Sequence, residues 1–517
     1  MFRRGLRKSR LTPGGMPGAE DGPMRIPRRT LLAMLPGAAL SRGAAMRPRP
    51  TRAIPLLIGN WADPTILKDG EDYYMTHSSF AFHPGLLVWH SKDLRRWKPI
   101  SRALLNQTGA VWAPEMIKYK GRYLIYYPAV EAGVSANWVV TAESPHGPWS
   151  EPQPIGAKHI DPGFVAGPDG KIFIHLSGGR SVEMSGDGLR ALGEPRQVYE
   201  GWPIPEDWAI ECFCLESPKL LFRNGWYYLT SAQGGTLGPS TSHMVVAARS
   251  KGPNGPWENS PYNPVIRTWS REEEWWSKGH GTIFEGPGGQ WYCVLHGVMK
   301  GFRTLGRPTL LEPVEWTPDG WYRVPDRWPA GWERPVVAEM PMSDDFTGSQ
   351  LGIQWQFHER FDKGRLRIEK GTLTLGAHGS KAGTSRPLAL MPMHRAYEIE
   401  VHAEAAPGVT AGLMLFASPS DYIGLALTPE GKLLRVQEGY RRYARTDEPA
   451  LPSSAAALRI VNDRQDVRFY YRSAEAGWKI LQPSIEVSSG GALRAALFAY
   501  GAGEARFRQF RYTPVEG

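Results

Sequence analysis

The stretch Cys212-Phe-Cys-Leu-Glu216-Ser-Pro-Lys-Leu-Leu-Phe-Arg-Asn-Gly-Trp-Tyr-Tyr-Leu-Thr230 has the pattern of two β-strands joined by a tight turn. A carboxylate, Glu216, stands in an apolar run, the pair Asn224-Gly225 marks the turn, and the second run carries paired aromatic residues. A Gly-containing turn between two apolar runs is a strong hairpin signal. The stretch therefore predicts a β-hairpin whose first strand carries a carboxylate.

Four similar phrases occur elsewhere between residues 60 and 300, each with a Gly turn followed by alternating or aromatic strand residues. Successive turn glycines are 51, 49, 55 and 64 residues apart. A period near 50 residues, with several short strands in each unit, is typical of a β-propeller. The sequence therefore predicts an all-β fold with five blades. The five turn glycines are Gly70, Gly121, Gly170, Gly225 and Gly289.

About six to nine residues before each of these glycines, four of the phrases carry a carboxylate and the fifth carries a histidine. Because the first strand of each propeller blade lines the central channel, we expect these side chains to converge on the axis. Carboxylates that face one another in a confined site have pKa values that are pushed apart, which suits an acid and a base. A single Asp-Pro pair is usually a turn, but its repetition at one position favours a functional funnel. The five residues are Asp63, Glu115, Asp161, Glu216 and His280.

The chain changes character after a segment rich in Pro, Trp and Arg, residues 325–341, which we interpret as a linker packed on the propeller. From Ser343 onward, segments with period-two alternation, such as residues 397–402, are separated by short polar turns. This pattern predicts an antiparallel β-sandwich. A chain of 517 residues is long enough for two domains with separate cores. We expect a propeller over residues 53–335 and a sandwich over residues 343–517.

The formal net charge of +10 lies in the first 52 residues, which hold 12 Lys or Arg and 2 Asp or Glu. The remaining chain has 49 basic and 49 acidic residues, so it lacks the basic surface that nucleic acid requires. Residues 1–52 also contain Arg28-Arg29, an apolar run too short to span a bilayer, and small residues after it. We therefore expect a removable export signal of the twin-arginine type, a periplasmic or extracellular protein, and neither a nucleic-acid nor a membrane partner.

The chain has only three cysteines. Cys212 and Cys214 are two residues apart, and neighbours on one face of a strand bridge poorly. Cys293 belongs to another repeat. We expect core thiols rather than a disulfide framework or metal ligands.

Taken together and in order, the phrases between about residues 55 and 335 resemble glycoside hydrolase family 43. The resemblance implies a five-bladed propeller that removes mostly β-D-xylose or α-L-arabinofuranose from plant polysaccharides, with inversion. The second domain is similar to the concanavalin-like C-terminal domain of some members, in which it buttresses the propeller. The matching stretches are Asn60-Trp-Ala-Asp-Pro-Thr-Ile66, Ser78-Ser-Phe80 with Pro84-Gly85, His90-Ser-Lys-Asp-Leu94, Val111-Trp-Ala-Pro-Glu115, Ile160-Asp-Pro-Gly163, Leu215-Glu-Ser-Pro-Lys219, Gly279-His-Gly-Thr282 and Leu305-Gly-Arg307.

The resemblance also implies catalytic roles. Asp63 looks like the general base that activates water, and Glu216 looks like the general acid that protonates the leaving oxygen. Asp161 looks like the third carboxylate, which raises the pKa of the acid and orients it. Inversion needs room for a water molecule, so the carboxyl groups of base and acid should lie about 6.5–9.5 Å apart.

Further residues follow from the same resemblance. Arg307 matches an arginine that reaches sugar hydroxyls, and Ser78, Phe80 and Trp112 would stack on or border a sugar ring. His280 corresponds to an axial histidine of the pocket, which in many members lies near a water-coordinated calcium ion. A structural Ca²⁺ is therefore the cofactor to consider and His280 the candidate metal residue, although Ca²⁺ itself prefers oxygen ligands.

Three departures from the family pattern leave the sugar open: Trp61-Ala62 before Asp63, Glu115 where Asp is common, and Ser217 after the acid. The leading hypothesis is an exo-acting hydrolase of oligo- or polysaccharide ends. One alternative is a catalytically silent glycan-binding propeller, and another is a five-bladed glycosidase of different sugar specificity. The sequence does not define the linkage, exo or endo action, carbohydrate binding by the sandwich or the oligomeric state.

Overall fold

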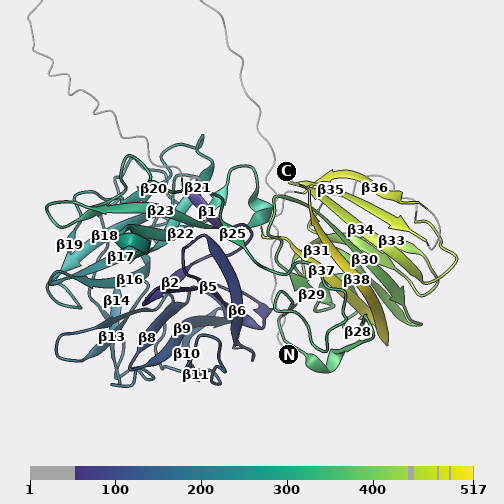
Figure 1. Ribbon diagram of the computed structural model, residues 1–517, viewed down its shortest axis with the longest axis horizontal. Helices are drawn as coiled ribbons and strands as arrows, with labels where there is room; N and C mark the ends of the chain where they lie inside the picture. Colours follow the sequence, from purple (N-terminus) through teal and green to yellow (C-terminus); the bar gives the residue numbers. More distant parts are fainter. Residues whose placement is uncertain are drawn as a thin grey trace, which may run out of the picture. The chain divides into compact units, whose positions relative to one another are not determined.

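The structure is a computed structural model that describes residues 53–515, except residues 107, 333, 441–447, 474–476 and 488–490. The expected export signal, residues 1–52, lies outside the described residues. Across the described part of the chain the regular structure is β-strand, with a few three-residue 3₁₀ turns (Figure 1). This confirms the prediction of an all-β fold. No helix among these residues has the length and apolar character needed to cross a membrane.

Five antiparallel blades form the propeller, and in the first four of them the chain runs through four strands in order from the first strand outward. The first strands of neighbouring blades contact one another around a closed ring, in the order β2, β8, β12, β16, β21 and back to β2. This ring confirms that equivalent positions of the five phrases meet at one axis. The first three blades consist of β2 (Thr65–Asp69), β3 (Asp72–Thr76), β5 (Gly85–Ser91) and β6 (Arg96–Leu104); β8 (Glu115–Tyr119), β9 (Arg122–Glu131), β10 (Val134–Ala142) and β11 (Gln153–Pro154); and β12 (Gly163–Ala166), β13 (Ile172–Leu176), β14 (Arg180–Met184) and β15 (Arg196–Gln197).

The last blade closes the ring, because its outermost strand comes from the start of the described chain: β1 pairs antiparallel with β23. The first and last blades are therefore joined by backbone hydrogen bonds. The fourth and fifth blades consist of β16 (Glu216–Arg223), β17 (Trp226–Gln233), β18 (Met244–Ser250) and β19 (Glu258–Asn259); and β21 (Trp275–Glu285), β22 (Trp291–Met299), β23 (Thr309–Trp316) and β1 (Ile54–Leu57). The short strands β7 (Ala110–Val111), β20 (Ile266–Arg267), β24 (Tyr322–Arg323) and β25 (Val337–Ala338) extend blades two, four, five and one.

The hairpin predicted for residues 212–230 is present, but its first strand begins only at Glu216. Asn224 and Gly225 have φ values of 50° and 75°, so both turn residues adopt the left-handed conformation. This is the tight turn that an Asn-Gly pair favours. The strand before it buries Lys219 and packs Leu220 toward the apolar cluster around Leu215 and Leu229.

The C-terminal part is a sandwich of two seven-stranded sheets, which confirms the concanavalin-like prediction. Side chains alternate along its strands: in β38, Ala505 and Phe507 are buried, whereas Arg506 and Arg508 are exposed. The first sheet runs through β33 (Leu433–Glu438), β32 (Asp421–Leu427), β31 (Val409–Ser418), β37 (Arg494–Gly501), β29 (Leu388–Leu390), β26 (Gln356–His358) and β4 (Phe82–His83). The second runs through β27 (Leu366–Glu369), β28 (Thr372–Gly376), β38 (Glu504–Pro514), β30 (Ala396–Ala405), β34 (Ala455–Asp463), β35 (Asp466–Arg472) and β36 (Lys479–Glu486).

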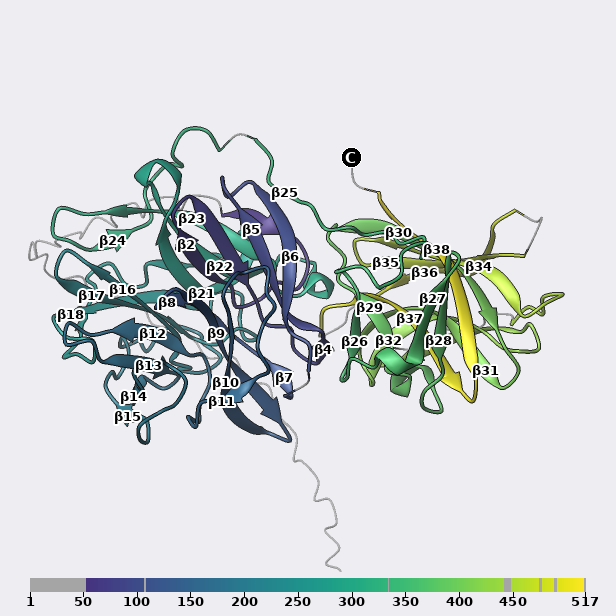
Figure 2. The ribbon, with the colours of Figure 1, turned by 60° about the horizontal axis from the view of Figure 1, so that its bottom comes forward.

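One strand of the first blade's connection, β4, belongs to a sandwich sheet because it pairs antiparallel with β26, as Figure 2 shows. The side chain of Gln356 donates hydrogen bonds to the carbonyls of Phe82 and Pro84, at 3.2 and 2.9 Å. Arg102 of β6 donates to the carbonyl of Ile353 at 2.7 Å. The segment that follows Ser78 and Phe80 is therefore fixed by backbone and side-chain hydrogen bonds to residues 353–358.

Candidate active site

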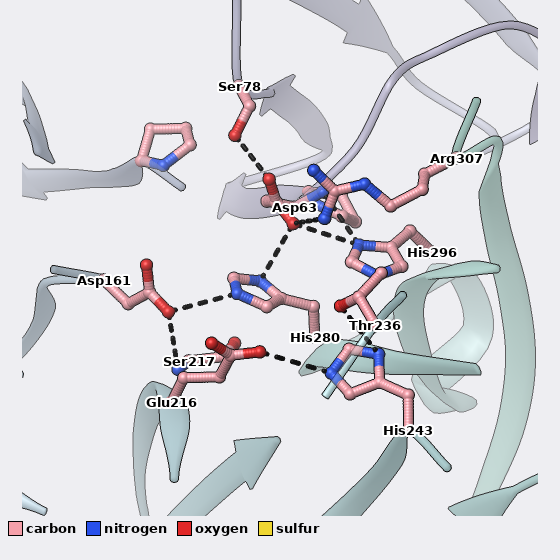
Figure 3. Close-up of polar contacts among 12 residues, drawn as sticks. Asp63, Ser78, Asp161, Glu216, Ser217, Thr236, His243, His280, His296 and Arg307 are labelled. Carbon is pink, nitrogen blue, oxygen red and sulfur yellow. Dashed lines mark hydrogen bonds and ion pairs between the residues drawn. The ribbon is translucent and has the colours of Figure 1, made fainter. Parts of the chain in front are cut away.

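One position recurs in four of the five blades: it lies two residues before the point from which the innermost strand pairs with the second strand without a break in register. Asp63, Asp161, Ser217 and His280 occupy it, and their φ values are 57°, 59°, 52° and 58°. Residues other than glycine seldom adopt this left-handed backbone, which costs about 1–3 kcal/mol. We call these four residues the upper ring; three of their side chains meet in one network (Figure 3).

Asp63 is buried, and both of its carboxylate oxygens accept hydrogen bonds. Its Oδ1 accepts a hydrogen bond from Arg307 at 2.8 Å, and its Oδ2 accepts one from the hydroxyl of Ser78 at 2.5 Å. Its backbone N–H donates to Nδ1 of His296 at 3.1 Å. Burial alone would raise the pKa of Asp63, but Arg307, and then His280 and His296, hold that pKa well below its usual value. Asp63 is therefore ionised at neutral pH.

His280 bridges two carboxylates. Its Nε2 lies 3.2 Å from Oδ2 of Asp161, and its Nδ1 lies 3.7 Å from Oδ1 of Asp63. Burial lowers the pKa of His280, but Asp63 and Asp161 outweigh it and raise that pKa. Burial, together with the charges of Glu216 and Asp63, raises the pKa of Asp161 against the effect of His280. The same oxygen of Asp161 accepts a hydrogen bond from the backbone N–H of Ser217 at 3.0 Å.

Glu216 is the most accessible of the three carboxylates: 22% of its side chain is exposed, against 6% for Asp63 and 3% for Asp161. Its Oε1 lies 3.5 Å from Nε2 of His243, and Figure 3 shows its carboxyl group and that of Asp63 on opposite sides of His280. Burial raises the pKa of Glu216, but the contact with His243 and the charge of His280 bring that pKa below the usual value. In the free site a proton therefore favours His280 over Glu216.

His243 is held in place from behind. Its Nδ1 lies 3.3 Å from the carbonyl oxygen of Ser277 and 3.4 Å from the hydroxyl of Thr236. Gly279 makes room for it, since a Cβ at that position would lie 2.3 Å from Nδ1 of the imidazole ring. The ring is completely buried. Glu216 is thereby linked through His243 to the Gly-rich loop that contains Thr236.

Sequence reasoning missed His243 and His296. His296 had a signal in the repeat, because it stands seven residues after its turn glycine, Gly289, just as His77 stands seven residues after Gly70. His77 directly follows β3, His296 lies within β22, and both are buried. His243 follows the variable loop after β17, and we find no repeat that would have marked it.

Glu115 starts an innermost strand at the axis, as predicted, but it does not join the upper ring around His280. It is the first paired residue of β8, two residues further along than the position of Asp63 in the first blade. Its Oε2 accepts hydrogen bonds from Nζ of Lys219 at 2.5 Å and from the hydroxyl of Thr65 at 3.0 Å. The repeat is aligned by its prolines, so Ala113-Pro114, and not Glu115, corresponds to Asp63-Pro64.

The predicted substrate-binding residues gather beside Asp63. Ser78 and Arg307 contact its two oxygens, and the guanidinium carbon of Arg307 lies 5.5 Å from the centre of the Phe80 ring. Phe80 exchanges two backbone hydrogen bonds with Val111, which brings it next to Trp112. Trp112 is 37% exposed.

A cavity of about 190 Å³ opens beside these residues. This is smaller than the roughly 300–1,000 Å³ of pockets for drug-sized ligands. One wall is the Gly-rich loop of residues 233–239, which we call the rim loop, and another is Gly491 and Ala492 of the sandwich. The lining residues are Asn60, Phe80, Thr236, Leu237, Gly238, Ser240, Trp276, Ser277, Val298, Gly306, Arg307, Gly491 and Ala492.

Asp63, His280 and His296 bring one possible ligand atom each to within 4.8 Å of one another. This set does not suit Ca²⁺, which takes six to eight oxygen ligands. The carboxylate already receives Arg307, and Nδ1 of His296 already accepts the N–H of Asp63. The residues around His280 therefore do not fit a directly bound calcium ion.

The prediction that Cys212 and Cys214 are free thiols is wrong, because the two form a disulfide with Cα atoms 5.2 Å apart. They do not lie on a strand: Cys214 has a left-handed φ of 38°, and β16 starts only at Glu216. The bridged segment is hydrogen-bonded to Gly234 of the rim loop through Glu211 N–H and Phe213 C=O. Cys293 is a buried free thiol, as expected.

Comparisons with known proteins agree with this geometry. A xylan 1,3-β-xylosidase of Vibrio sp. is 32% identical over 357 residues, which is 58% of this chain and 63% of that protein. A non-reducing end α-L-arabinofuranosidase of Bacteroides ovatus is 32% identical over 342 residues, 59% of this chain and 60% of that protein. The chain thus spans less than two thirds of the length of either relative.

A crystal structure of a GH43 protein from Bacillus licheniformis matches the fold with a TM-score of 0.78 and 27% identity, over 89% of this chain and 99% of that chain. The model of the β-xylosidase C-terminal concanavalin A-like domain matches residues 343–513. The model of glycosyl hydrolases family 43 matches residues 53–322, more than half of the chain. The chain belongs to glycoside hydrolase family 43.

Proposed function

We propose that this protein is an inverting, exo-acting glycoside hydrolase that removes β-D-xylosyl or α-L-arabinofuranosyl units from plant oligo- or polysaccharides. The observation that carries the proposal is the set of three carboxylates around His280, each in a different environment. The similar proteins named above, a xylosidase and an arabinofuranosidase, support the class of sugar. The relative from Bacteroides ovatus, a non-reducing end α-L-arabinofuranosidase, supports action on chain ends.

Asp63 is suited to be the general base. It stays ionised because of Arg307, and Ser78 fixes its second oxygen. In the proposed reaction Asp63 takes a proton from a water molecule while the water oxygen forms a bond with the anomeric carbon. Because water attacks from the face opposite the leaving group, the configuration inverts.

Glu216 is suited to be the general acid, since it is the most accessible carboxylate. It gives its proton to the leaving oxygen as the glycosidic bond breaks. In the free site the pKa of Glu216 is lowered and that of His280 is raised, so we infer that substrate binding brings a proton to Glu216. Asp161 lies next to the backbone of Ser217 and thereby orients the acid. Arg307 and Phe80, which line the cavity, are placed to bind the sugar.

The test is hydrolysis of 4-nitrophenyl β-D-xylopyranoside and 4-nitrophenyl α-L-arabinofuranoside, with the anomer of the first product read by NMR. We expect turnover with inversion, lost in Asp63→Asn and in Glu216→Gln. The matched control is Glu194→Gln, an exposed carboxylate of the third blade. Retention of configuration, or activity that survives both substitutions, would contradict the mechanism. Binding of xylo-oligosaccharides by folded protein without turnover of a wider glycoside panel would indicate a glycan-binding propeller.

We also propose that the protein is exported. Arg28-Arg29 and the short apolar run after them support this, and so does the Cys212–Cys214 disulfide, because disulfides persist in oxidising compartments. Fractionation of cells that express the full chain, with N-terminal sequencing of the product, tests it. Activity that stays in the cytoplasm with residues 1–52 attached would contradict export.

A further inference from the structure

A second ring of residues lies next to the upper ring, two positions further along each innermost strand. We call it the floor ring. From each member onward, the innermost strand pairs with the second strand of its blade without a break in register; in blades four and five the members Lys219 and Thr282 follow a register shift. Lys219 is 4% exposed and Glu115 is 7% exposed, so this ring holds a buried pair of opposite charges. The members are Thr65, Glu115, Gly163, Lys219 and Thr282.

Lys219 is surrounded by oxygen atoms. Its Nζ donates to Oε2 of Glu115 at 2.5 Å, to the carbonyl of Pro114 at 2.9 Å and to the carbonyl of Pro162 at 3.5 Å. An ammonium group has three N–H donors, and here each has an acceptor. Carboxylate and carbonyl oxygens around one positive charge are also the usual environment of a bound hard metal ion.

The floor ring is tied to the catalytic carboxylates by short lengths of chain. Lys219 stands three residues after Glu216 on β16, and its acceptor Pro162 follows Asp161 directly. Blades three and four are therefore joined at two levels: by Ser217 N–H to Asp161 in the upper ring, and by Lys219 to Pro162 in the floor ring.

Glu115 extends the connection to the first two blades. It belongs to blade two, and its Oε2 also accepts from Thr65 of blade one. Thr282 of blade five donates to the carbonyl of Pro64 at 3.3 Å. Hydrogen bonds thus link all five innermost strands at this level, with Lys219 as the positive charge.

We propose that the Lys219 ammonium is a built-in cation of the propeller axis, which draws together the inner strands of blades two, three and four and so positions Asp161 and Glu216. It does the work of a bound metal ion at this level, which agrees with the poor fit of the His280 site to Ca²⁺. Lys219 is a positioning residue, because it acts through the strand that carries Glu216. The inference rests on the proposed function for the roles of Asp161 and Glu216.

The first test separates charge from packing. Lys219→Met keeps the length of the side chain and removes its charge, and Lys219→Met/Glu115→Gln removes both charges, which guards against unfolding by an unpaired carboxylate. Turnover is measured on a phenyl glycoside, which needs acid assistance, and on a 2,4-dinitrophenyl glycoside, which does not. The matched control is Lys171→Met, at an exposed ion pair of blade three.

We expect both Lys219 variants to lose tenfold or more in kcat on the phenyl glycoside, with KM changed less than threefold and the dinitrophenyl glycoside nearly unaffected, since general acid catalysis contributes about 10²–10⁴-fold. Equal losses on both substrates would show a merely structural residue and overturn the proposal. Wild-type turnover of the phenyl glycoside by the double variant would overturn it too.

The second test does not depend on activity. Lys219→Ala leaves space at the axis, and we expect methylammonium to raise its melting temperature by several degrees, whereas methanol at the same concentration does not. The wild-type protein should not respond to methylammonium. An equal response of both proteins, or no response of the variant, contradicts a built-in cation. If no glycoside is hydrolysed by the wild-type protein, the proposed function fails, while this measurement still decides the role of Lys219.

Discussion

Replacement of Gly163 by alanine adds one methyl group between the blades that carry Asp161 and Glu216. A Cβ built on Gly163 would lie 1.8 Å from the carbonyl oxygen of Pro218 and 2.8 Å from its carbon. Both are backbone atoms of β16, so no side chain can rotate away. The φ of Gly163 is not left-handed, and the effect of the substitution is therefore steric rather than conformational.

The size of the expected effect of Gly163→Ala follows from the same contact. Real Cβ atoms do not approach other heavy atoms within 3.0 Å, so β12 and β16 must separate by at least about 1.2 Å. The 3.0 Å hydrogen bond from Ser217 to Asp161 is then lost. A misplacement of about 1 Å can cost about 100-fold in rate, which is about 2.7 kcal/mol of transition-state stabilisation. Overpacking of this kind typically destabilises the fold by about 1–3 kcal/mol.

The assay is kcat and KM for the aryl glycoside that the wild-type protein hydrolyses, together with the melting temperature. We expect Gly163→Ala to lower kcat by about 100-fold at a similar KM. Gly193→Ala, in the same blade, is the control, because a Cβ at that position meets nothing within 4 Å. A Gly163→Ala protein with kcat within threefold of the wild type would show that the approach of β12 to β16 does not set the catalytic geometry.

Three further predictions follow from the site. Arg307→Gln should raise the pKa of Asp63. Because the base must be ionised to act, the acid limb of the kcat/KM profile should then move to higher pH. An acid limb at the wild-type pH would show that Arg307 does not control the pKa of the base. Glu216→Gln should lose at least about 100-fold on a phenyl glycoside but little on a 2,4-dinitrophenyl glycoside; similar losses on both would exclude it as the acid. Cys212→Ser/Cys214→Ser should lower the free energy of unfolding by only about 1–2 kcal/mol, because the closed loop is short. It should also change kcat more than it changes KM. Urea unfolding measures the first effect and steady-state kinetics the second.

The fold could be predicted because its signals are local and repeated. Each Gly turn can be recognised from a few residues, and its occurrence five times at intervals of about 50 residues strengthens the prediction. The positions of Asp63, Asp161 and His280 followed, since one innermost strand per blade must reach the axis. The sandwich was predictable for a similar reason: period-two alternation, such as that of Ala505 and Phe507 in β38, is set by the sheet face alone.

Depth along the axis was not predictable in the same way. Glu115 and Asp63 are both axial carboxylates, but a shift of two residues places Glu115 one ring away, against Lys219. Distance from a turn glycine tolerates such a shift because turn and strand lengths vary between blades. The role of His243 could not be predicted, because its position depends on a loop that has no counterpart in the other blades and on the absence of a side chain at Gly279. The Cys212–Cys214 bridge was missed because the strand was assumed to begin before Glu216.

The arrangement of cations explains how one funnel holds a base and an acid at the same pH. The partner of Asp63 is the guanidinium of Arg307, which keeps its charge at every working pH, so the base stays ionised. The partners of Asp161 and Glu216 are the imidazoles of His280 and His243, and an imidazole, unlike a guanidinium, has a neutral as well as a charged form. The protonation of Asp161 and Glu216 can therefore change while Asp63 stays ionised. If Lys219 holds the acid-side strands together from below, this division of charge is maintained by residues of the chain itself.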